Sequence, residues 1–327
     1  MLSASAAAAM EGGVRLLLSV LLVLLLVPGW TAEERLPLPS PGHRLSAERV
    51  ALDPDDPARR RLGGLVYLGG VALSSGDPAF GGFSALAVEG DRFMTVSDGG
   101  NVLRFRMGAD WRVRDASYAP LPAGPGTGWE KRERDTEALA RDPAGGRFWV
   151  AFERANQIWR FGPGARVARV APPAMRRWRQ NGGAESMARL PDGGFVVLAE
   201  NGGEALRFAG DPVARAPAFR FRYRPAAGMK PVDAAALPDG RLLVLERRFR
   251  APYRWDSRLA VVSAGAVGPG TRVRGRTLAR WAEPLLSDNF EGIAAVREGN
   301  ATVLWMVSDD NQSMLQRTLL LKFRLDA

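Results

Sequence analysis

The chain repeats one pattern of apolar and polar residues, in which a short apolar strand, a tight turn and a second apolar strand lead to an acidic residue. The most regular copy runs from Ala184 to Glu200 and turns at residues 191–194, so Glu185 and Glu200 lie equally far from the turn. An antiparallel hairpin places both carboxylates at the same end. The pattern therefore predicts a β-hairpin with acidic residues at its open end.

Five copies of this hairpin are spaced like the blades of a β-propeller. Their first strands start at positions 84, 137, 185, 233 and 291, which lie 48 to 58 residues apart, and only the copy at Ser84 lacks an acid there. Repeats of short strands at this spacing are typical of propellers. Third strands that end in an apolar-Arg-Phe sequence follow several hairpins, at residues 101–105, 157–161 and 205–208. Strand alternation predicts that each arginine faces water and each phenylalanine lies between blades.

The two ends of the chain decide how the propeller closes. Residues 62–73 and 317–325 have the composition of strands, and we predict that they share a blade and so close the ring. These terminal strands, or the weakly patterned residues 211–224, could also supply a sixth blade. The sequence predicts an all-β fold with a single propeller, for which we favour six blades over five or seven.

The first residues resemble a targeting segment. Arg15 is followed by the apolar run 16–27, which only Ser19 interrupts, and then by Pro28 and Gly29. This pattern is typical of a secretory signal peptide and is short for a membrane span, although an uncleaved anchor stays open. We divide the chain into a signal peptide (1–32), a loosely held lead-in (33–60) and the propeller (61–327). We expect a periplasmic or secreted protein that meets the membrane only through the signal peptide or an uncleaved anchor.

Composition restricts the partners. The formal net charge is +10, and only Lys131, Lys230 and Lys322 are lysines, so arginine carries nearly all of the positive charge. This charge either spreads over solvated faces or attracts an anionic small molecule. We do not expect nucleic acid as a partner, because charge without a recognised binding module is weak support for it. The chain has no cysteine and hence no disulfide, and we expect a monomer.

Several chemistries lack the residues that they need. The only histidine, His43, lies before the first predicted blade, so a catalytic triad or a histidine-ligated metal is not supported. Glycine pairs such as Gly81-Gly82 lack both the spacing of a phosphate-binding loop and a following helix. Catalysis in this chain must therefore use carboxylates, arginines and a hard metal ion, without an organic cofactor.

The hairpin geometry gathers acids at one end of the propeller. The acids at the open ends of the hairpins are Glu137, Glu153, Glu185, Glu200, Asp233, Glu246, Glu291 and Asp309. So many neighbouring carboxylates cannot all stay ionised unless cations compensate them. Calcium and the arginines of adjoining loops are the candidates. Alternatively, each acid binds backbone N–H groups or an arginine and locks its own blade.

The sequence also resembles a known family. The segments that carry the resemblance are Gly82–Leu86 with Val96–Asp98, Asp135–Leu139, Asn289–Ile293, Val307–Asn311 and Gln316–Leu320. In this order they resemble the phytase-like propeller family that is described as having esterase-like activity, over residues 61 to 326. The resemblance implies a β-propeller exported by bacteria. Through similarity to calcium-dependent phytases, it also implies phosphoester hydrolysis.

Three functions are consistent with these observations: a calcium-dependent phosphoester or ester hydrolase, a non-catalytic periplasmic propeller that binds a ligand or a protein, and a metal-dependent lactonase. For the hydrolase, the predicted catalytic residues are Glu137, Glu291, Asp309 and Arg317. The predicted substrate-binding residues are Arg154, Arg177, Arg247 and Arg248. The predicted metal ligands are Glu137, Glu185, Asp233, Glu291, Asp309 and Asp310. Among these, we expect the irregular copy from Asn289 to Arg317 to carry the chemistry.

Overall fold

The computed structural model describes residues 14–20, 36–142, 144–251, 254–313 and 315–326. They belong to two compact units, Met1–Arg35 and Leu36–Ala327. In the first unit residues 14–20 form a helix, and the rest of the predicted signal peptide lies outside the described residues. No helix in the described part of the chain combines the length and the hydrophobicity that a membrane crossing needs.

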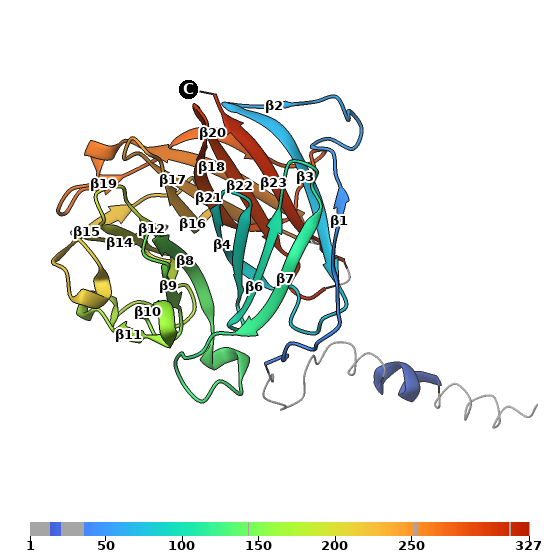
Figure 1. Ribbon diagram of the computed structural model, residues 1–327, viewed down its shortest axis with the longest axis horizontal. Coiled ribbons are helices and arrows are strands. Elements are labelled where there is room, and N and C mark those ends of the chain that lie inside the picture. The colour runs from blue at the N-terminus through green and yellow to red at the C-terminus, as the bar shows by residue number, and fades with distance from the viewer. Residues whose placement is uncertain (1–13, 21–35, 143, 252–253, 314, 327) are drawn as a thin grey trace, which may run out of the picture. The chain divides into compact units, whose positions relative to one another are not determined.

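The unit Leu36–Ala327 is a five-bladed β-propeller (Figure 1). Blade 1 holds β4 (Phe83–Glu89), β5 (Arg92–Ser97), β6 (Asn101–Met107) and β7 (Val113–Pro120), and blade 2 holds β8 (Thr136–Asp142), β9 (Arg147–Phe152), β10 (Gln157–Phe161) and β11 (Val167–Val170). Blade 3 holds β12 (Ala184–Arg189), β13 (Phe195–Ala199), β14 (Glu204–Phe208) and β15 (Ala218–Tyr223), with β19 (Arg272–Val273) added in parallel at its edge.

Blade 4 holds β16 (Lys230–Ala236), β17 (Leu242–Arg250), β18 (Arg254–Val262) and β20 (Arg276–Trp281). Blade 5 holds β21 (Asn289–Glu298), β22 (Ala301–Asp309), β23 (Thr318–Leu325), β3 (Leu65–Ser75) and β1 (Leu45–Arg49), with β2 (Arg61–Leu62) paired to β3. Short 3-10 helices lie in the connections at Lys131–Glu133, Pro163–Ala165, Pro173–Met175, Pro212–Ala214 and Ala264–Ala266.

Blade 5 closes the ring with both ends of the unit. Strand β3 pairs with β23, as the neighbouring blue and red strands of Figure 1 show. This confirms the prediction that the terminal strands share a blade. The propeller has five blades and not the six that we favoured, because the terminal strands join the fifth hairpin and residues 218–223 complete blade 3 as β15. The segment expected to be a loosely held lead-in contributes β1, which pairs with β3 from Leu45–Ser75 to Arg49–Val71.

The hydrophobic core consists of five clusters, one at each interface between neighbouring blades. The cluster between blades 1 and 2, for example, joins Val96 and Val102 to Val150 and Phe161. The phenylalanines of the apolar-Arg-Phe endings, Phe105, Phe161 and Phe208, are all buried in such clusters. Each fully buried side chain of this size contributes about 1.5–3 kcal/mol of folding free energy. The innermost strands of the five blades pack against one another in a closed circle; these strands are β4, β8, β12, β16 and β21. Equivalent residues of the five strands therefore surround the central axis of the ring.

Candidate functional site

The inner strands share a β-bulge close to their first residues. The pairing with the second strand shifts by one residue in all five blades, at Phe83/Ala85, Thr136/Ala138, Ala184/Ser186, Pro231/Asp233 and Phe290/Gly292. The residues left out of the pairing are Ser84, Glu137, Glu185, Val232 and Glu291. A bulge redirects the side chain of the unpaired residue. Three glutamates therefore occupy equivalent positions where the inner strands begin, at the end of the ring that we call the channel mouth.

The repeat spacing predicted that Asp233 is equivalent to Glu137, Glu185 and Glu291, but the structure places it one residue further along its strand. The bulge residue of blade 4 is Val232, and Asp233 is the next residue, paired in register with Leu245. The Asp233 side chain is 1% exposed and accepts hydrogen bonds from the backbone N–H groups of Ala234 and Ile293, both at 2.8 Å. Burial raises its pKa well above the usual value, while these N–H groups act in the opposite direction. Asp233 thus fastens blade 4 to the inner strand of blade 5.

Replacement of Asp233 by alanine should destabilise the propeller without changing its response to calcium. The variant leaves two buried N–H groups without acceptors, which costs about 1–3 kcal/mol each in the free energy of unfolding. Urea unfolding of Asp233→Ala measures this loss. Asp239→Ala, at an exposed aspartate of the same blade, is the matched control and should change stability by less than about 0.5 kcal/mol. Equal losses in both variants would contradict the fastening role.

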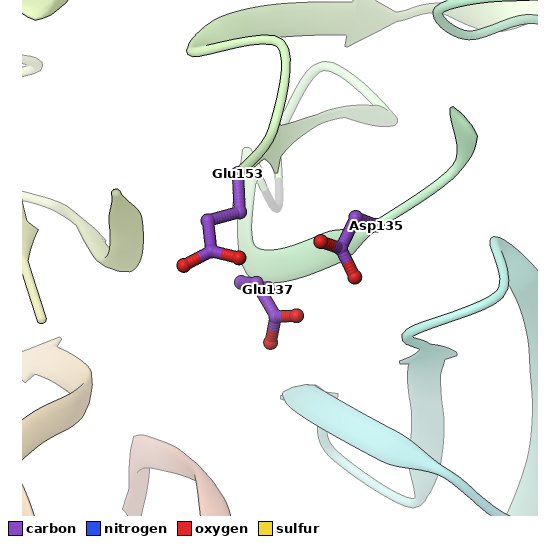
Figure 2. A group of neighbouring side chains, drawn as sticks. All are labelled: Asp135, Glu137 and Glu153. Atoms are coloured by element: carbon purple, nitrogen blue, oxygen red, sulfur yellow. The ribbon is translucent and has the colours of Figure 1, made fainter. Parts of the chain in front are cut away.

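Three carboxylates of blade 2 converge at the channel mouth. One oxygen from each of Asp135, Glu137 and Glu153 lies within 4.8 Å of the others. Figure 2 shows these side chains, with Asp135 just before β8, Glu137 in β8 and Glu153 just after β9. Glu153 also accepts hydrogen bonds from the backbone N–H groups of Gly182 and Gly183, the latter at 2.9 Å. The connection between blades 2 and 3 therefore holds Glu153 in place.

Neighbouring acids raise the pKa values in this group. Burial, followed by the charges of Glu291 and Asp135, raises the pKa of Glu137 well above the usual value. Burial and the charge of Glu137 do the same to the pKa of Glu185. Burial and the charge of Glu153 raise the pKa of Asp135 to about 7. We call Asp135, Glu137, Glu153, Glu185 and Glu291 the carboxylate site, because their charges act on one another across three blades.

One guanidinium reaches into this site from blade 4. Arg247 donates to the side chains of Asn289 and Glu291 and lies over the ring of Trp255, 4.8 Å from its centroid. Asn289 donates through Nδ2 to Glu291 at 2.8 Å and to Asp309 at 3.3 Å. Burial, followed by the charges of Glu291 and Asp98, raises the pKa of Asp309 well above the usual value. The structure thus brings together three predicted residues, Glu291, Asp309 and Arg247.

Other predicted residues are used in different ways. Asp310 accepts from the backbone N–H groups of Gly82 and Gln312 and from the Thr318 hydroxyl at 2.8–2.9 Å, so it joins the loop after β22 to blade 1. Arg154 pairs with Asp135 at 2.9 Å, and Arg248 pairs with Asp256. Arg177 and Arg317 are exposed on loops of the channel mouth, and neither makes an ion pair with another described residue.

Sequence reasoning missed Asp135 and Asp98. The Asp-Thr-Glu sequence held the signal for Asp135, because residues two apart in an extended segment point to the same side, here toward the position of Glu137. Asp98 follows β5 and pairs with Lys131 at 2.6 Å. This pair joins two loops that are distant in sequence, and no local pattern in the sequence indicates it.

The opposite end of the ring of inner strands is different in character. A cavity of about 410 Å³ lies there and is lined by the far ends of all five inner strands. Its walls are mostly aliphatic, with Leu86, Ala87, Leu139, Ala140, Met187, Ala188, Ala235, Leu237, Ile293 and Ala295 among the lining residues. The converging carboxylates therefore mark one end of the ring only.

A known protein family matches the part of the chain that contains these residues. The family model described as "Phytase-like: Esterase-like activity of phytase" matches residues 78–312, which include the whole carboxylate site. No curated protein matches the chain.

Among solved structures, a candidate gluconolactonase has 12% identity and a TM-score of 0.47, and the match covers 89% of this chain and 97% of that one. Virginiamycin B lyase from Staphylococcus aureus has 10% identity and a TM-score of 0.43, with 85% of this chain and 99% of that one covered.

Proposed function

Because this chain belongs to the phytase-like family described by the esterase-like activity of phytase, we propose that it is a hydrolase of phosphoester or ester bonds that uses calcium. The observation that carries the proposal is the convergence of five carboxylates from three blades at the channel mouth. Burial, followed by the charges of neighbouring acids, raises the pKa values of Glu137, Glu185 and Asp135, and a bound divalent cation would offset the repulsion between these charges. We place the reaction outside the cytoplasm, on the basis of the apolar run at residues 16–27.

The donor atoms at the channel mouth fit a hard cation. Carboxylate and hydroxyl oxygens are the ligands that calcium prefers, in sets of about six to eight. Beyond the acids, the ring position of blade 1 holds Ser84, whose buried hydroxyl has no hydrogen-bond partner among the described residues. An unpartnered buried oxygen is costly unless a ligand or water uses it. Glu137, Glu185, Glu291 and Ser84 are therefore our proposed ligands, with Asp135 and Glu153 beside them.

The surrounding residues can position a substrate. Calcium at this site would supply a Lewis acid for the carbonyl or phosphoryl oxygen and would offset the negative charge of the carboxylates. Arg177 and Arg317 lie exposed at the mouth and can bind the anionic group of a substrate. Arg247 holds Glu291 through a charged hydrogen bond, and Arg154 does the same for Asp135. These contacts fix the orientation of two acids before a substrate arrives.

One observation favours the second candidate, a non-catalytic binding propeller. Several acids of the hairpins already have complete sets of protein partners, as Asp233, Asp310 and Glu246 show. An arginine also compensates Glu291 within the site. If protein donors and arginines also satisfy the remaining acids of the carboxylate site in solution, no metal ion is needed there. The propeller would then bind a ligand without turnover.

Turnover assays separate these candidates. The purified protein is tested with calcium on phytate, a generic phosphomonoester, a carboxylic ester and a lactone, and then with a chelator. We expect turnover of a phosphoester or a carboxylic ester that the chelator abolishes and that Glu137→Gln lowers by about 100-fold or more. Glu298→Gln, at a surface glutamate paired with Lys322, is the matched control and should keep full activity.

Two outcomes would decide against the hydrolase. A folded protein without turnover on all four substrates would favour the binding propeller. Activity on the lactone alone would favour the third function, a metal-dependent lactonase.

A further inference from the structure

The large apolar side chains that reach solvent are not spread evenly over the propeller. Within the described residues of the unit Leu36–Ala327, the most exposed ones are Leu315 (74%), Trp129 (69%), Leu38 (63%) and Phe249 (51%). All four lie on the side of the channel mouth. The two less exposed ones, Leu68 and Val167, lie elsewhere, in β3 and at the first residue of β11.

Chain direction fixes this location. Trp129 lies between β7 and β8, in a connection that leads into the start of an inner strand. Leu315 lies in the connection from β22 to β23, next to the loop that carries Asp309 and Asp310. Phe249 lies in the part of β17 that continues past Glu246 and packs on Trp255, with ring centroids 4.8 Å apart.

Leu38 belongs to the segment before β1. The neighbouring Pro37 carbonyl accepts from the Asn101 side chain at 2.8 Å, at the mouth end of β6. We call the surface formed by these loops the mouth face.

Positive charge accompanies the apolar side chains. The connection from β11 to β12 carries Arg176, Arg177 and Arg179, all exposed, and residues 171–183 contain no acid. These arginines make no ion pair with another described residue. The carboxylates of the carboxylate site, by contrast, are buried or half-buried. The outermost layer of the mouth face thus combines apolar side chains with uncompensated arginines.

Such a combination fits the boundary of an anionic bilayer. Tryptophan and other large apolar side chains insert at the level of the lipid headgroups, and basic residues add attraction to anionic lipids. Single exposed apolar side chains are common on protein surfaces, but here the four most exposed ones among the described residues of the unit gather at one end of the ring. A flat partner touches all of these loops at once, because they stand around one end of a ring. The net charge of +10 acts in the same direction.

The first described residue of the unit Leu36–Ala327 also lies at the mouth face. The Leu36 backbone N–H donates to the Trp129 carbonyl at 3.0 Å, so the first described residue of the unit lies beside an exposed tryptophan of the mouth face.

We propose that the mouth face docks on an anionic lipid bilayer, with Trp129, Phe249 and Leu315 in the headgroup layer and with Arg176 and Arg179 on the lipid phosphates. The channel mouth then opens toward the bilayer surface. This proposal does not require that the propeller be catalytic, and its test has a separate readout from the turnover assays.

Single-cysteine labelling of the full-length chain tests the contact directly, because the chain has no cysteine of its own. An environment-sensitive fluorophore is attached at Trp129→Cys, Phe249→Cys or Leu315→Cys, with Leu68→Cys and Val167→Cys as controls at exposed apolar positions elsewhere. Vesicles of phosphatidylglycerol and phosphatidylcholine should shift the emission of the three mouth-face labels to the blue and leave both control labels unchanged. A circular dichroism spectrum confirms that each labelled variant is folded.

Charge is tested in a second arm. Arg176→Gln with Arg179→Gln should weaken binding to the anionic vesicles by roughly fivefold for each arginine removed. Equal shifts with phosphatidylcholine alone would overturn the anionic part of the proposal.

Unchanged mouth-face labels would overturn the docking itself, including the case in which only the N-terminal segment binds lipid. A shift that grows with protein concentration in the absence of vesicles would mean that a second copy of the chain covers this face, and would also overturn the proposal.

Discussion

Replacement of Arg258 by methionine is expected to lower the free energy of unfolding by about 3–5 kcal/mol. Arg258 is 4% exposed and donates through Nη1 to both carboxylate oxygens of Glu246, each at 2.7 Å, while Glu246 is fully buried. The same guanidinium donates to the Thr277 hydroxyl and to the Gly275 carbonyl. Methionine fills a similar volume but leaves the carboxylate charge without its main partner in a site that water does not reach.

Tyr223 makes this network a link between two blades. Its hydroxyl, on β15 of blade 3, donates to Glu246 on β17 of blade 4 at 2.5 Å. Burial, followed by the charge of Glu246, raises the pKa of Tyr223, so the phenol keeps its proton and stays a donor. Loss of the ion pair therefore weakens the interface between blades 3 and 4 as well as blade 4 itself.

Chemical denaturation of Arg258→Met gives the size of the effect, and two further variants give its origin. Arg106→Met removes an exposed ion pair with Asp91 and should cost less than about 1 kcal/mol. Arg258→Met combined with Glu246→Gln should be more stable than Arg258→Met alone, because the uncompensated charge is gone. A double variant less stable than the single one would show that the loss comes from packing and not from charge.

The repeats explain why the fold could be predicted and the blade number could not. Each hairpin carries its own period-2 pattern and turn, so the five inner strands follow from local sequence. The pairing of β3 with β23 depends on contacts between residues more than two hundred positions apart. The addition of β1 depends on its pairing with β3, and a strand pattern alone does not show to which sheet it belongs. Within the weakly patterned residues 211–224, residues 218–223 form the fourth strand of blade 3, and the sequence pattern did not show to which sheet they belong.

For the candidate site, too, the sequence predicted the repeated positions but not which neighbouring residue occupies each of them. Repeat spacing located Glu137, Glu185 and Glu291, because all three are bulge residues. Repeat spacing could not show whether Asp233 or Val232 is the bulge residue of blade 4. The position of a bulge has no sequence pattern of its own, and an error of one residue exchanges the side chain that the bulge redirects. Partners decided the role of the remaining acids: a buried arginine holds Glu246, and backbone N–H groups hold Asp233 and Asp310.

Neutralisation of two acids of the carboxylate site should stabilise the calcium-free protein. Glu137→Gln with Glu185→Gln removes two buried charges that repel each other, and we expect a gain of about 1–2 kcal/mol in the free energy of unfolding at pH 7.5. The sign follows from the raised pKa values, since a carboxyl group that binds its proton more tightly when folded destabilises the protein as the pH rises.

For Asp135, whose pKa rises from 3.8 to about 7, this loss develops between about pH 4 and pH 7. The double variant lacks two further carboxyl groups with raised pKa values, so its calcium-free stability should fall less steeply with rising pH than that of the unmodified protein. Parallel pH profiles would contradict the mutual repulsion of these acids.

The most direct measurement of the central claim is the melting temperature of the unmodified protein and of Glu137→Gln, each with a chelator and with calcium. At a calcium concentration of about 100 times the dissociation constant, binding adds about 2.7 kcal/mol, which raises the melting temperature by roughly 5–10 °C. The account predicts this rise for the unmodified protein and for the control Glu298→Gln, and its loss in Glu137→Gln. An unmodified protein whose melting temperature does not respond to calcium would contradict it.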